Sequence, residues 1–348
     1  MAKKAVIGVL ILAVVIIGGL FGYVRIEGRA VDSTSKATQI FTVEQGTGAA
    51  QIGSSLKTRG LIRSYRAFML QAKLSGSISR MQAGSYAFSK AMSMSEMIND
   101  MVSGDTAGQT FTVTEGMSME KIAAMLAKQG ICTKKAFYAA AEKKSFEDYK
   151  FSKYLADDSA ANRLEGFLYP DTYEVAIGAS PKEVLDVMLK NFDAHVTDKY
   201  YKEAKKQGTN IYKIITAASI IQREAGVTDD MPKVASVIYN RLDADMYLQM
   251  DSILSYITNE DKVIASYSDT NIDSAYNPYK NKGLPPGPIC SPGIDAIEAA
   301  LEPADTKYLY FVDSEKLDGT LNFSDNEKQF YKDKAAFEKA YKKSQENK

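Results

Sequence analysis

The chain is poor in the side chains from which metal sites and nucleophilic catalytic triads are built. Its 348 residues include one histidine and two cysteines. A zinc site of the usual kind needs three or four His or Cys ligands, and a Ser-His-Asp mechanism would have to use His195, which lies in an ordinary helical pattern. Cys132 and Cys290 are too few and too far apart for a disulfide framework, so we expect free thiols. If the chain is an enzyme, its acid–base groups are therefore carboxylates, and nothing implies a metal or a cofactor.

The chain also lacks net charge, because its 43 lysines and arginines are matched by 43 aspartates and glutamates. A nucleic-acid-binding protein usually carries a basic excess, so we exclude that class of partner. Apolar content of 45% and charged content of 25% are ordinary for a folded protein. The length is sufficient for one large domain or for two to three smaller ones.

The N-terminal segment predicts an association with a membrane. After residues 1–4, which include Lys3 and Lys4, residues 5–24 form an uncharged run, AVIGVLILAVVIIGGLFGYV. About twenty apolar residues suffice for a transmembrane helix, and the lysines before the run favour a cytoplasmic N-terminus. The alternative is a long, cleaved signal peptide. In either case the rest of the chain lies outside the cytoplasm, and the polar residues 25–38 are interpreted as a tether.

The first half of the chain contains an internal repeat. Residues 41–60 (FTVEQGTGAAQIGSSLKTRG) and 111–130 (FTVTEGMSMEKIAAMLAKQG) match at an offset of 70 residues. Each copy predicts a strand, a glycine turn and a helix that ends at a glycine. The pattern resembles LysM-like modules, which bind glycans containing N-acetylglucosamine; the alternative is a small α/β spacer. We assign residues 39–106 to the first module and residues 107–159 to the second copy and a connector.

Residues 160–346 carry the candidate chemistry, above all in one helix. Residues 211–226 (IYKIITAASIIQREAG) predict a helix with one apolar stripe, and Glu224 lies at the border of that stripe. A carboxyl group among apolar neighbours loses hydration, which favours its protonated form and suits a general acid. The alternative is an exposed glutamate near a frayed helix end. In the earlier segment LEGFLYPDTYEV, we expect Glu165 and Asp171 to brace a turn.

The segments after this helix supply polar and aromatic side chains that could hold a sugar. A second amphipathic helix begins near residue 234, and a short strand or extended edge follows it near residue 250. A stiff loop, GLPPGP, is then followed by a helix expected to start at Ser291-Pro292, a buried strand over residues 307–312 and a terminal helix. The candidate substrate-binding residues are Asn240, Arg241, Gln249, Asp251, Tyr276, Asn277, Tyr279, Leu284 and Pro285.

In this order, the segments resemble the endolytic murein transglycosylase (MltG, YceG-like) family. The resemblance covers about residues 40–330, and GLPPGPI and the A-S-I-x-x-x-E helix are its most specific motifs. It implies an α+β fold with a single N-terminal anchor, a LysM-like module and a catalytic domain. It also implies cleavage between MurNAc and GlcNAc within nascent peptidoglycan strands, leaving 1,6-anhydroMurNAc ends, with Glu224 as the catalytic glutamate. Location at the cell membrane and association with cell-wall synthases are expectations of the same kind.

The chain departs from the family pattern at three places. Gln222 stands where relatives often have a second glutamate, which leaves Glu224 without a local rival. Asp251-Ser252-Ile253 replaces the usual DPT, which predicts a less rigid loop, and Leu321 stands where relatives often have histidine. Two alternatives stay open: a muramidase-type hydrolase with Asp251 as a second acid, and an inactive, membrane-tethered scaffold that binds peptidoglycan.

Overall fold

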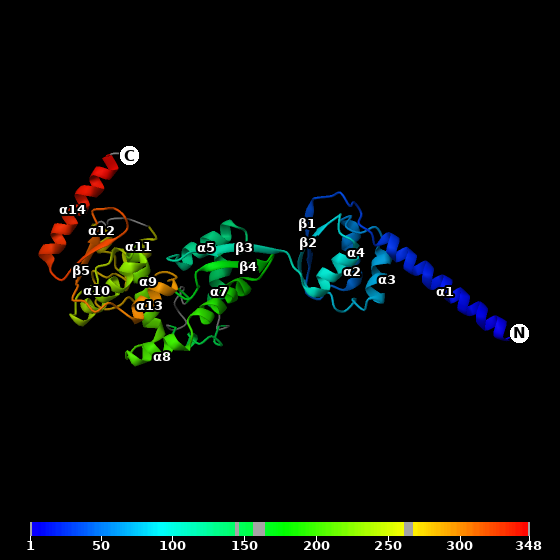
Figure 1. The fold of residues 1–348 in the computed structure, drawn as a ribbon, viewed down its shortest axis with the longest axis horizontal. Helices are drawn as coiled ribbons and strands as arrows, with labels where there is room; N and C mark the ends of the chain where they lie inside the picture. Colours follow the sequence, from blue (N-terminus) through cyan, green and yellow to red (C-terminus); the bar gives the residue numbers. More distant parts are fainter. Residues whose placement is uncertain (1, 143–145, 156–163, 261–266, 347–348) are drawn as a thin grey trace. The chain divides into compact units, whose positions relative to one another are not determined.

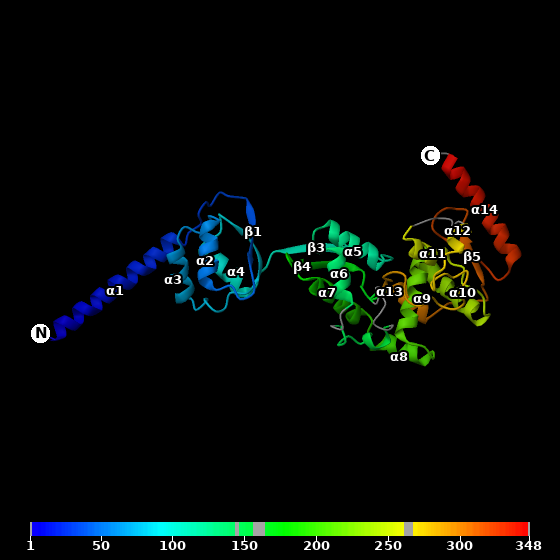
Figure 2. The same ribbon diagram turned by 180° about the vertical axis from the view of Figure 1, so that it is seen from behind.

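The computed structural model describes residues 2–142, 146–155, 164–260 and 267–346; within these ranges it does not describe the side chains of residues 2–6, 9, 10, 13, 17 and 267. The chain divides into two compact units (Figures 1 and 2). Unit 1 comprises Met1–Thr110 and Glu174–Ala179, and unit 2 comprises Phe111–Tyr173 and Ser180–Lys348.

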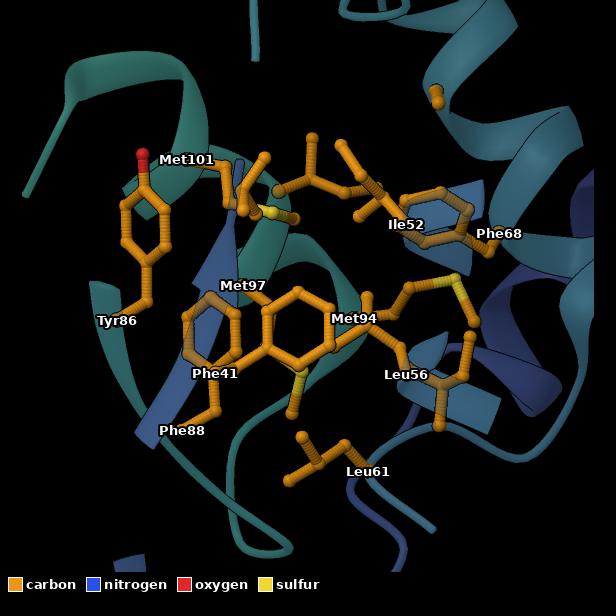
Figure 3. Packing of buried hydrophobic residues seen from close by; sticks show 14 of the residues in the cluster. Phe41, Ile52, Leu56, Leu61, Phe68, Tyr86, Phe88, Met94, Met97 and Met101 are labelled. Carbon is orange, nitrogen blue, oxygen red and sulfur yellow. The ribbon is translucent and has the colours of Figure 1, made fainter. Parts of the chain in front are cut away.

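Unit 1 is a small α/β structure that follows a long N-terminal helix. Strand β1 pairs antiparallel with β2, with Phe41 opposite Tyr86. Helices α2, α3 and α4 supply the rest of the core, and Figure 3 shows their apolar side chains converging on Phe41 and Phe88. These two rings stack with centroids 5.8 Å apart. The elements are α1 (Ala2–Glu27), β1 (Thr38–Val43), α2 (Ala49–Thr58), α3 (Tyr65–Leu74), β2 (Gly84–Ser89) and α4 (Met94–Ser103).

The segment between α1 and β1 is held against unit 1 by backbone hydrogen bonds. The carbonyl of Gly28 accepts from the Met94 amide at 2.9 Å, and the guanidinium of Arg63 donates to the carbonyl of Ala30 at 2.8 Å. These contacts differ from those of the free tether that its polar composition predicts.

In the part of the chain that the structure describes, no helix is both long enough and apolar enough to cross a membrane. The transmembrane helix expected over residues 5–24 therefore stays a prediction.

Unit 2 is larger and mainly helical. Strands β3 and β4 pair with each other. In chain order, the elements from β3 onward are β3 (Gly108–Val113), α5 (Met119–Lys128), α6 (Lys134–Ala141), η1 (Ser152–Tyr154), β4 (Asp171–Ala176), α7 (Pro181–His195), α8 (Asp198–Lys206), α9 (Ile211–Glu224), η2 (Thr228–Asp230), α10 (Met231–Asp243), α11 (Asp251–Thr258), α12 (Tyr267–Thr270), α13 (Ile294–Leu301), β5 (Tyr310–Asp313), β6 (Leu321–Ser324) and α14 (Glu327–Glu346). Strands β5 and β6 pair antiparallel, with Phe311 opposite Phe323.

The internal repeat extends well beyond the two matching sequence segments. Each copy has the expected strand, turn and helix, and Gly46 and Gly116 adopt similar left-handed conformations, with φ of 86° and 78°. The order strand, two helices, strand, helix is then completed by α3, β2 and α4 in one copy and by α6, β4 and α7 in the other. The described parts of unit 1 and of residues 111–195 thus share one β-α-α-β-α arrangement.

The second part of this repeat is not found when the sequence is compared with itself at one fixed offset. Tyr173 lies 87 residues after Tyr86, whereas Phe111 lies 70 residues after Phe41. Both tyrosines nevertheless donate their hydroxyl to a carbonyl four residues earlier, at 2.7 Å for Tyr86 and 2.5 Å for Tyr173. Both following helices begin with a Ser–Glu capping box. The longer connection before β4 shifts the register and hides the likeness.

Helix α9 forms the centre of unit 2. Every residue from Ile214 to Ile221 is buried, so the helix is covered on all sides by its neighbours α8, α10, α11 and α13. The single apolar stripe predicted from the sequence was therefore too narrow. A helix surrounded in this way is a rigid support for the residue at its end, which is Glu224.

Three further local predictions were wrong. The helix expected at Ser291 begins only at Ile294, because the Ser291 amide and carbonyl pair with Met117 and Gly116 in an extended conformation. The extended edge expected near residue 250 does not continue past Met250, because helix α11 begins at Asp251. Strand β5 starts at Tyr310, and its residues are partly exposed instead of buried.

Candidate active site

Glu224 is the last residue of α9 and is partly buried. The backbone amide of Ser252, in the first turn of α11, donates to Glu224 Oε1 at 3.2 Å. Burial raises the pKa of Glu224, the nearby Asp251 and Asp313 raise it further, and the hydrogen bond from Ser252 opposes the shift. The position therefore favours a carboxyl group that keeps its proton to a higher pH than an exposed glutamate.

The carboxyl group of Glu224 borders a cleft of about 500 Å³ that lies entirely within unit 2. Its lining includes residues of β5 and α14 and of the ends of α9 and α10. The first turn of α11 and Tyr279 complete the lining. This size is in the range of small-molecule binding sites. The cleft brings together four predicted site residues besides Glu224, namely Arg241, Gln249, Asp251 and Tyr279.

Arg241 joins two walls of the cleft. Its side chain is only 8% exposed, and its Nε donates to the carbonyl of Leu309 at 2.6 Å. One terminal nitrogen donates to the carbonyl of Leu248, and the guanidinium lies over the ring of Tyr310, 5.4 Å from its centroid. Burial lowers the pKa of Arg241, although the nearby Tyr310 and Glu224 oppose this shift. Arg241 therefore fixes the strand opposite Glu224 and also brings a positive charge to the cleft.

Asp251 and Tyr279 form a hydrogen-bonded pair on the cleft lining. The Tyr279 hydroxyl donates to Asp251 Oδ1 at 2.6 Å. Burial, followed by this hydrogen bond, raises the pKa of Tyr279, so that the hydroxyl keeps its proton. Gln249 reaches the lining through a left-handed backbone with φ of 49°. A non-glycine residue with positive φ is uncommon and marks a position that the surrounding structure holds in place.

The other five predicted substrate-binding residues do not line this cleft. The Asn240 amide donates to the carbonyls of Thr306 and Tyr308 at 3.0 and 2.9 Å, which ties α10 to the segment before β5. Asn277 is fully buried and braces its own loop. Tyr276 packs against Tyr256, and Leu284 and Pro285 lie in the proline loop. Their roles in substrate binding stay predictions, while their contacts indicate bracing.

The two most specific sequence motifs contact each other at α9, the helix that ends at Glu224. Ser219 Oγ accepts from the Ile289 amide at 3.0 Å, and the Cys290 thiol donates to the Ser219 carbonyl at 3.2 Å. Gln222 Oε1 accepts from the Gly293 amide at 2.8 Å. The A-S-I-x-x-x-E helix and the proline loop are thus fastened to each other. Ser219 and Gln222, the polar side chains of the helix motif, therefore help to hold Glu224 in position.

Two departures from the family pattern lie at the cleft itself. Ser252 supplies the amide that bonds Glu224, and Leu321 lines the cleft from β6. Residues 251–253, expected to form a loop, form the first turn of α11 instead, and their lower rigidity stays a prediction. Leu321 places an apolar residue in the cleft lining.

Sequence reasoning missed the part of the cleft lining that β5 and α14 supply. Strand β5 contributes Tyr310 and Asp313, and α14 contributes Phe330 and Tyr331. Burial raises the pKa of Asp313. The only sequence signal was an aspartate directly after an aromatic strand, which a turn would also explain. Nothing in the local pattern relates these residues to Glu224, about ninety residues earlier in the chain.

Glu165 is a buried carboxyl group away from the cleft. It is 2% exposed and accepts the Met119 amide through both oxygens, at 2.9 and 3.1 Å. It therefore braces the start of α5, as predicted for this segment. Burial raises the pKa of Glu165 to about 8, and the hydrogen bond from Met119 opposes that shift.

We expect Glu165 to make folding stability depend on pH. Its pKa is raised above the unfolded value, so its favourable contribution is complete at low pH and is lost as pH rises through about 8. Between pH 6 and pH 9 this costs about 2–3 kcal/mol of unfolding free energy. Denaturant titrations at both pH values should show the loss in wild type and a much smaller loss in Glu165→Gln. Equal losses in the two proteins would assign the effect to other groups.

The described residues contain no group of three or more His, Cys, Asp or Glu side chains that could hold a metal ion.

Comparison with known proteins identifies the family of the chain. The model of the YceG-like family matches residues 41–336. The endolytic murein transglycosylase of Bacillus subtilis (strain 168) is 36% identical over 332 residues, covering 92% of this chain and 91% of that protein. The protein of the same name from Streptococcus pneumoniae serotype 2 (strain D39 / NCTC 7466) is 31% identical and matches 93% of this chain, which spans 63% of that longer relative.

A solved structure shows the same fold. The crystal structure of the putative yceG-like protein lmo1499 from Listeria monocytogenes aligns with a TM-score of 0.58 and 31% identity, covering 86% of this chain and 99% of that one. The sequence matches extend over both units, the site and the proline loop. The chain belongs to the YceG-like family.

Proposed function

We propose that Glu224 is the acid with which this chain, a lytic transglycosylase that acts on peptidoglycan, cleaves the bond between MurNAc and GlcNAc. The substrate is a nascent glycan strand cut at an internal position, and the product carries a 1,6-anhydroMurNAc end. The observation that carries the proposal is the carboxyl group of Glu224, which has a raised pKa and borders a cleft of about 500 Å³ from the end of a buried helix. The murein transglycosylase names of the relatives agree with it.

The reaction needs one proton carrier. Glu224 starts protonated and gives its proton to the glycosidic oxygen as the bond to C1 of MurNAc breaks. The C6 hydroxyl of the same sugar then closes onto C1, and its proton returns to the Glu224 carboxylate. The Ser252 amide stabilises the carboxylate between the two steps. Arg241, in the lining of the same cleft, favours the same ionised state through its positive charge. No water is consumed.

Two neighbouring carboxyl groups favour one alternative, a muramidase-type hydrolysis. A hydrolase needs a second carboxylate to activate water or to attack the sugar. Asp251 and Asp313 both border the cleft. Asp251 is engaged by the Tyr279 hydroxyl, and Asp313 lies at the end of β5. Asp313 was not among the residues singled out from the sequence.

Product masses distinguish these reactions. Purified protein is incubated with uncrosslinked glycan strands, and new ends are measured by mass spectrometry. We expect anhydro ends in the middle of strands, with no gain of water. Ends heavier by one water would establish hydrolysis instead, and unchanged strands would favour an inactive scaffold that only binds peptidoglycan. If Asp313→Asn leaves the product mass unchanged, Asp313 is not the second carboxylate that hydrolysis would require.

We also propose that unit 1 binds glycan as a LysM-like module. Its strand, two helices and strand, repeated in residues 111–176, support this assignment. In the Glu224→Gln protein, removal of residues 39–106 should reduce sedimentation with insoluble peptidoglycan. Undiminished sedimentation would show that this unit is a spacer.

Attachment to the cell membrane, with the N-terminus in the cytoplasm and the catalytic part outside, completes the proposal. It rests on the uncharged run at residues 5–24 and the lysines before it. The full chain should sediment with membranes and resist alkaline extraction, whereas a chain starting at residue 28 should not. Equal behaviour of the two chains would remove the anchor. Cooperation with cell-wall synthases follows from such a location and is testable by co-purification from detergent-solubilised membranes.

A further inference from the structure

One face of the C-terminal helix α14 is turned to the cleft that Glu224 borders. Six of its residues line this cleft, and their spacing of three or four places them on a single helical face. Helix α14 packs on β5 and β6 (Figure 2), and of its residues only Phe337 is buried. The other members of the face are available to a molecule in the cleft. The six residues are Glu327, Phe330, Tyr331, Lys334, Phe337 and Glu338.

Aromatic rings lead along this wall from Arg241 to the solvent. The guanidinium of Arg241 lies over Tyr310 at 5.4 Å. The Tyr310 ring contacts Phe330, and Phe330 contacts Tyr331, each with centroids 5.4 Å apart. Tyr331 is 60% exposed. Tyr331 is therefore accessible to a molecule bound in the cleft.

The shape and chemistry of this wall match a sugar ring. The C–H face of a pyranose is apolar and packs on an aromatic face, while its hydroxyl and N-acetyl groups need hydrogen-bonding partners at the edge. Glu327, Lys334 and Glu338 provide such partners around the rings. Because the rings and Glu224 border one continuous cleft, a strand bound for cleavage at Glu224 would extend along α14.

We propose that Tyr310, Phe330 and Tyr331 form a stacking platform for a sugar of the glycan strand some way from the bond that is cut. The proposal rests on the function proposed for Glu224. It makes α14 an element that positions the substrate and Tyr331 a determinant of how tightly long strands bind. Tyr331 itself takes no part in proton transfer.

The test uses Tyr331→Leu, which keeps apolar bulk but removes the ring, and Tyr331→Phe, which keeps the ring. Binding of uncrosslinked glycan strands is measured by calorimetry in the Glu224→Gln background, where no cleavage interferes. We expect Kd to rise about 5- to 10-fold for Tyr331→Leu and to change little for Tyr331→Phe. In active protein KM should rise by a similar factor while kcat stays within about 2-fold. The control is Tyr247→Ala, an exposed tyrosine whose side chain lies outside the cleft lining.

The results separate this proposal from the one on which it rests. A Kd for Tyr331→Leu equal to that of wild type, or a Tyr331→Phe variant as weak as Tyr331→Leu, would overturn the platform even if cleavage depends on Glu224. If the chain produced no anhydro ends but Tyr331→Leu still weakened strand binding, the platform would stand and the reaction would be wrong. Shortening the glycan stepwise should abolish the difference between wild type and Tyr331→Leu once the strand no longer reaches α14.

Discussion

Replacing Glu224 by glutamine should reduce cleavage of glycan strands by about 10³- to 10⁴-fold, the largest effect of any single substitution in the cleft. Glutamine has nearly the same shape and can still accept the Ser252 amide, but it has no proton to give. The rate of appearance of anhydro ends, followed by mass spectrometry, measures the loss. The melting temperature should stay within a few degrees of wild type, because a neutral amide replaces a carboxyl group whose pKa burial raises.

A matched control tests whether position or merely the presence of a glutamate matters. The double variant Glu224→Gln, Gln222→Glu restores a glutamate two residues earlier on the same helix. Gln222 is held by the Gly293 amide and reaches the Glu115 carboxylate, which is away from the cleft lining. We therefore expect no recovery of activity. Recovery in the double variant, or full activity of Glu224→Gln alone, would show that another group is the acid.

Gly166→Ala should destabilise unit 2 by about 2–4 kcal/mol. The residue has φ of +86°, and a Cβ atom there would lie 2.5 Å from the Pro288 side chain and 2.9 Å from Ile215. Neither neighbour can move easily, because Pro288 belongs to the stiff proline loop and Ile215 to the buried helix α9. Thermal unfolding should show a melting temperature lower by about 5–10 °C.

The control for this substitution is Gly208→Ala. Gly208 has a similar φ of +72°, but no atom lies within 4 Å of the position a Cβ would take. Only backbone strain remains there, so we expect a loss of about 1 kcal/mol. The difference between the two variants measures the close packing of LEGF against the proline loop. Equal losses would mean that strain alone explains both and that this packing contributes little.

The proposed acid and the residues that share its cleft could be singled out from the sequence because their signals are local. Glu224 lies at the end of an apolar helix with no histidine or metal site as competitor, and Arg241, Gln249, Asp251 and Tyr279 were singled out with it. All five lie at one cleft. The same reasoning placed Asn240 and Asn277 in the site, because an amide suited to hold a sugar is equally suited to hold a backbone carbonyl. Only the structure shows that the amide groups of Asn240 and Asn277 already donate hydrogen bonds to backbone carbonyl groups.

By itself, the sequence predicted most of the helices, the repeat between residues 41–60 and 111–130, and the position of Glu224 on its helix. These properties depend on periodicity and composition over short stretches. The tertiary structure decided what surrounds the acid: the Ser252 amide, the carboxyl group of Asp313 and the aromatic wall of β5 and α14. It also showed that the proline loop and the residues after it are hydrogen-bonded to α9. Contacts between segments up to a hundred residues apart leave no local pattern, because they arise only when the packed elements meet.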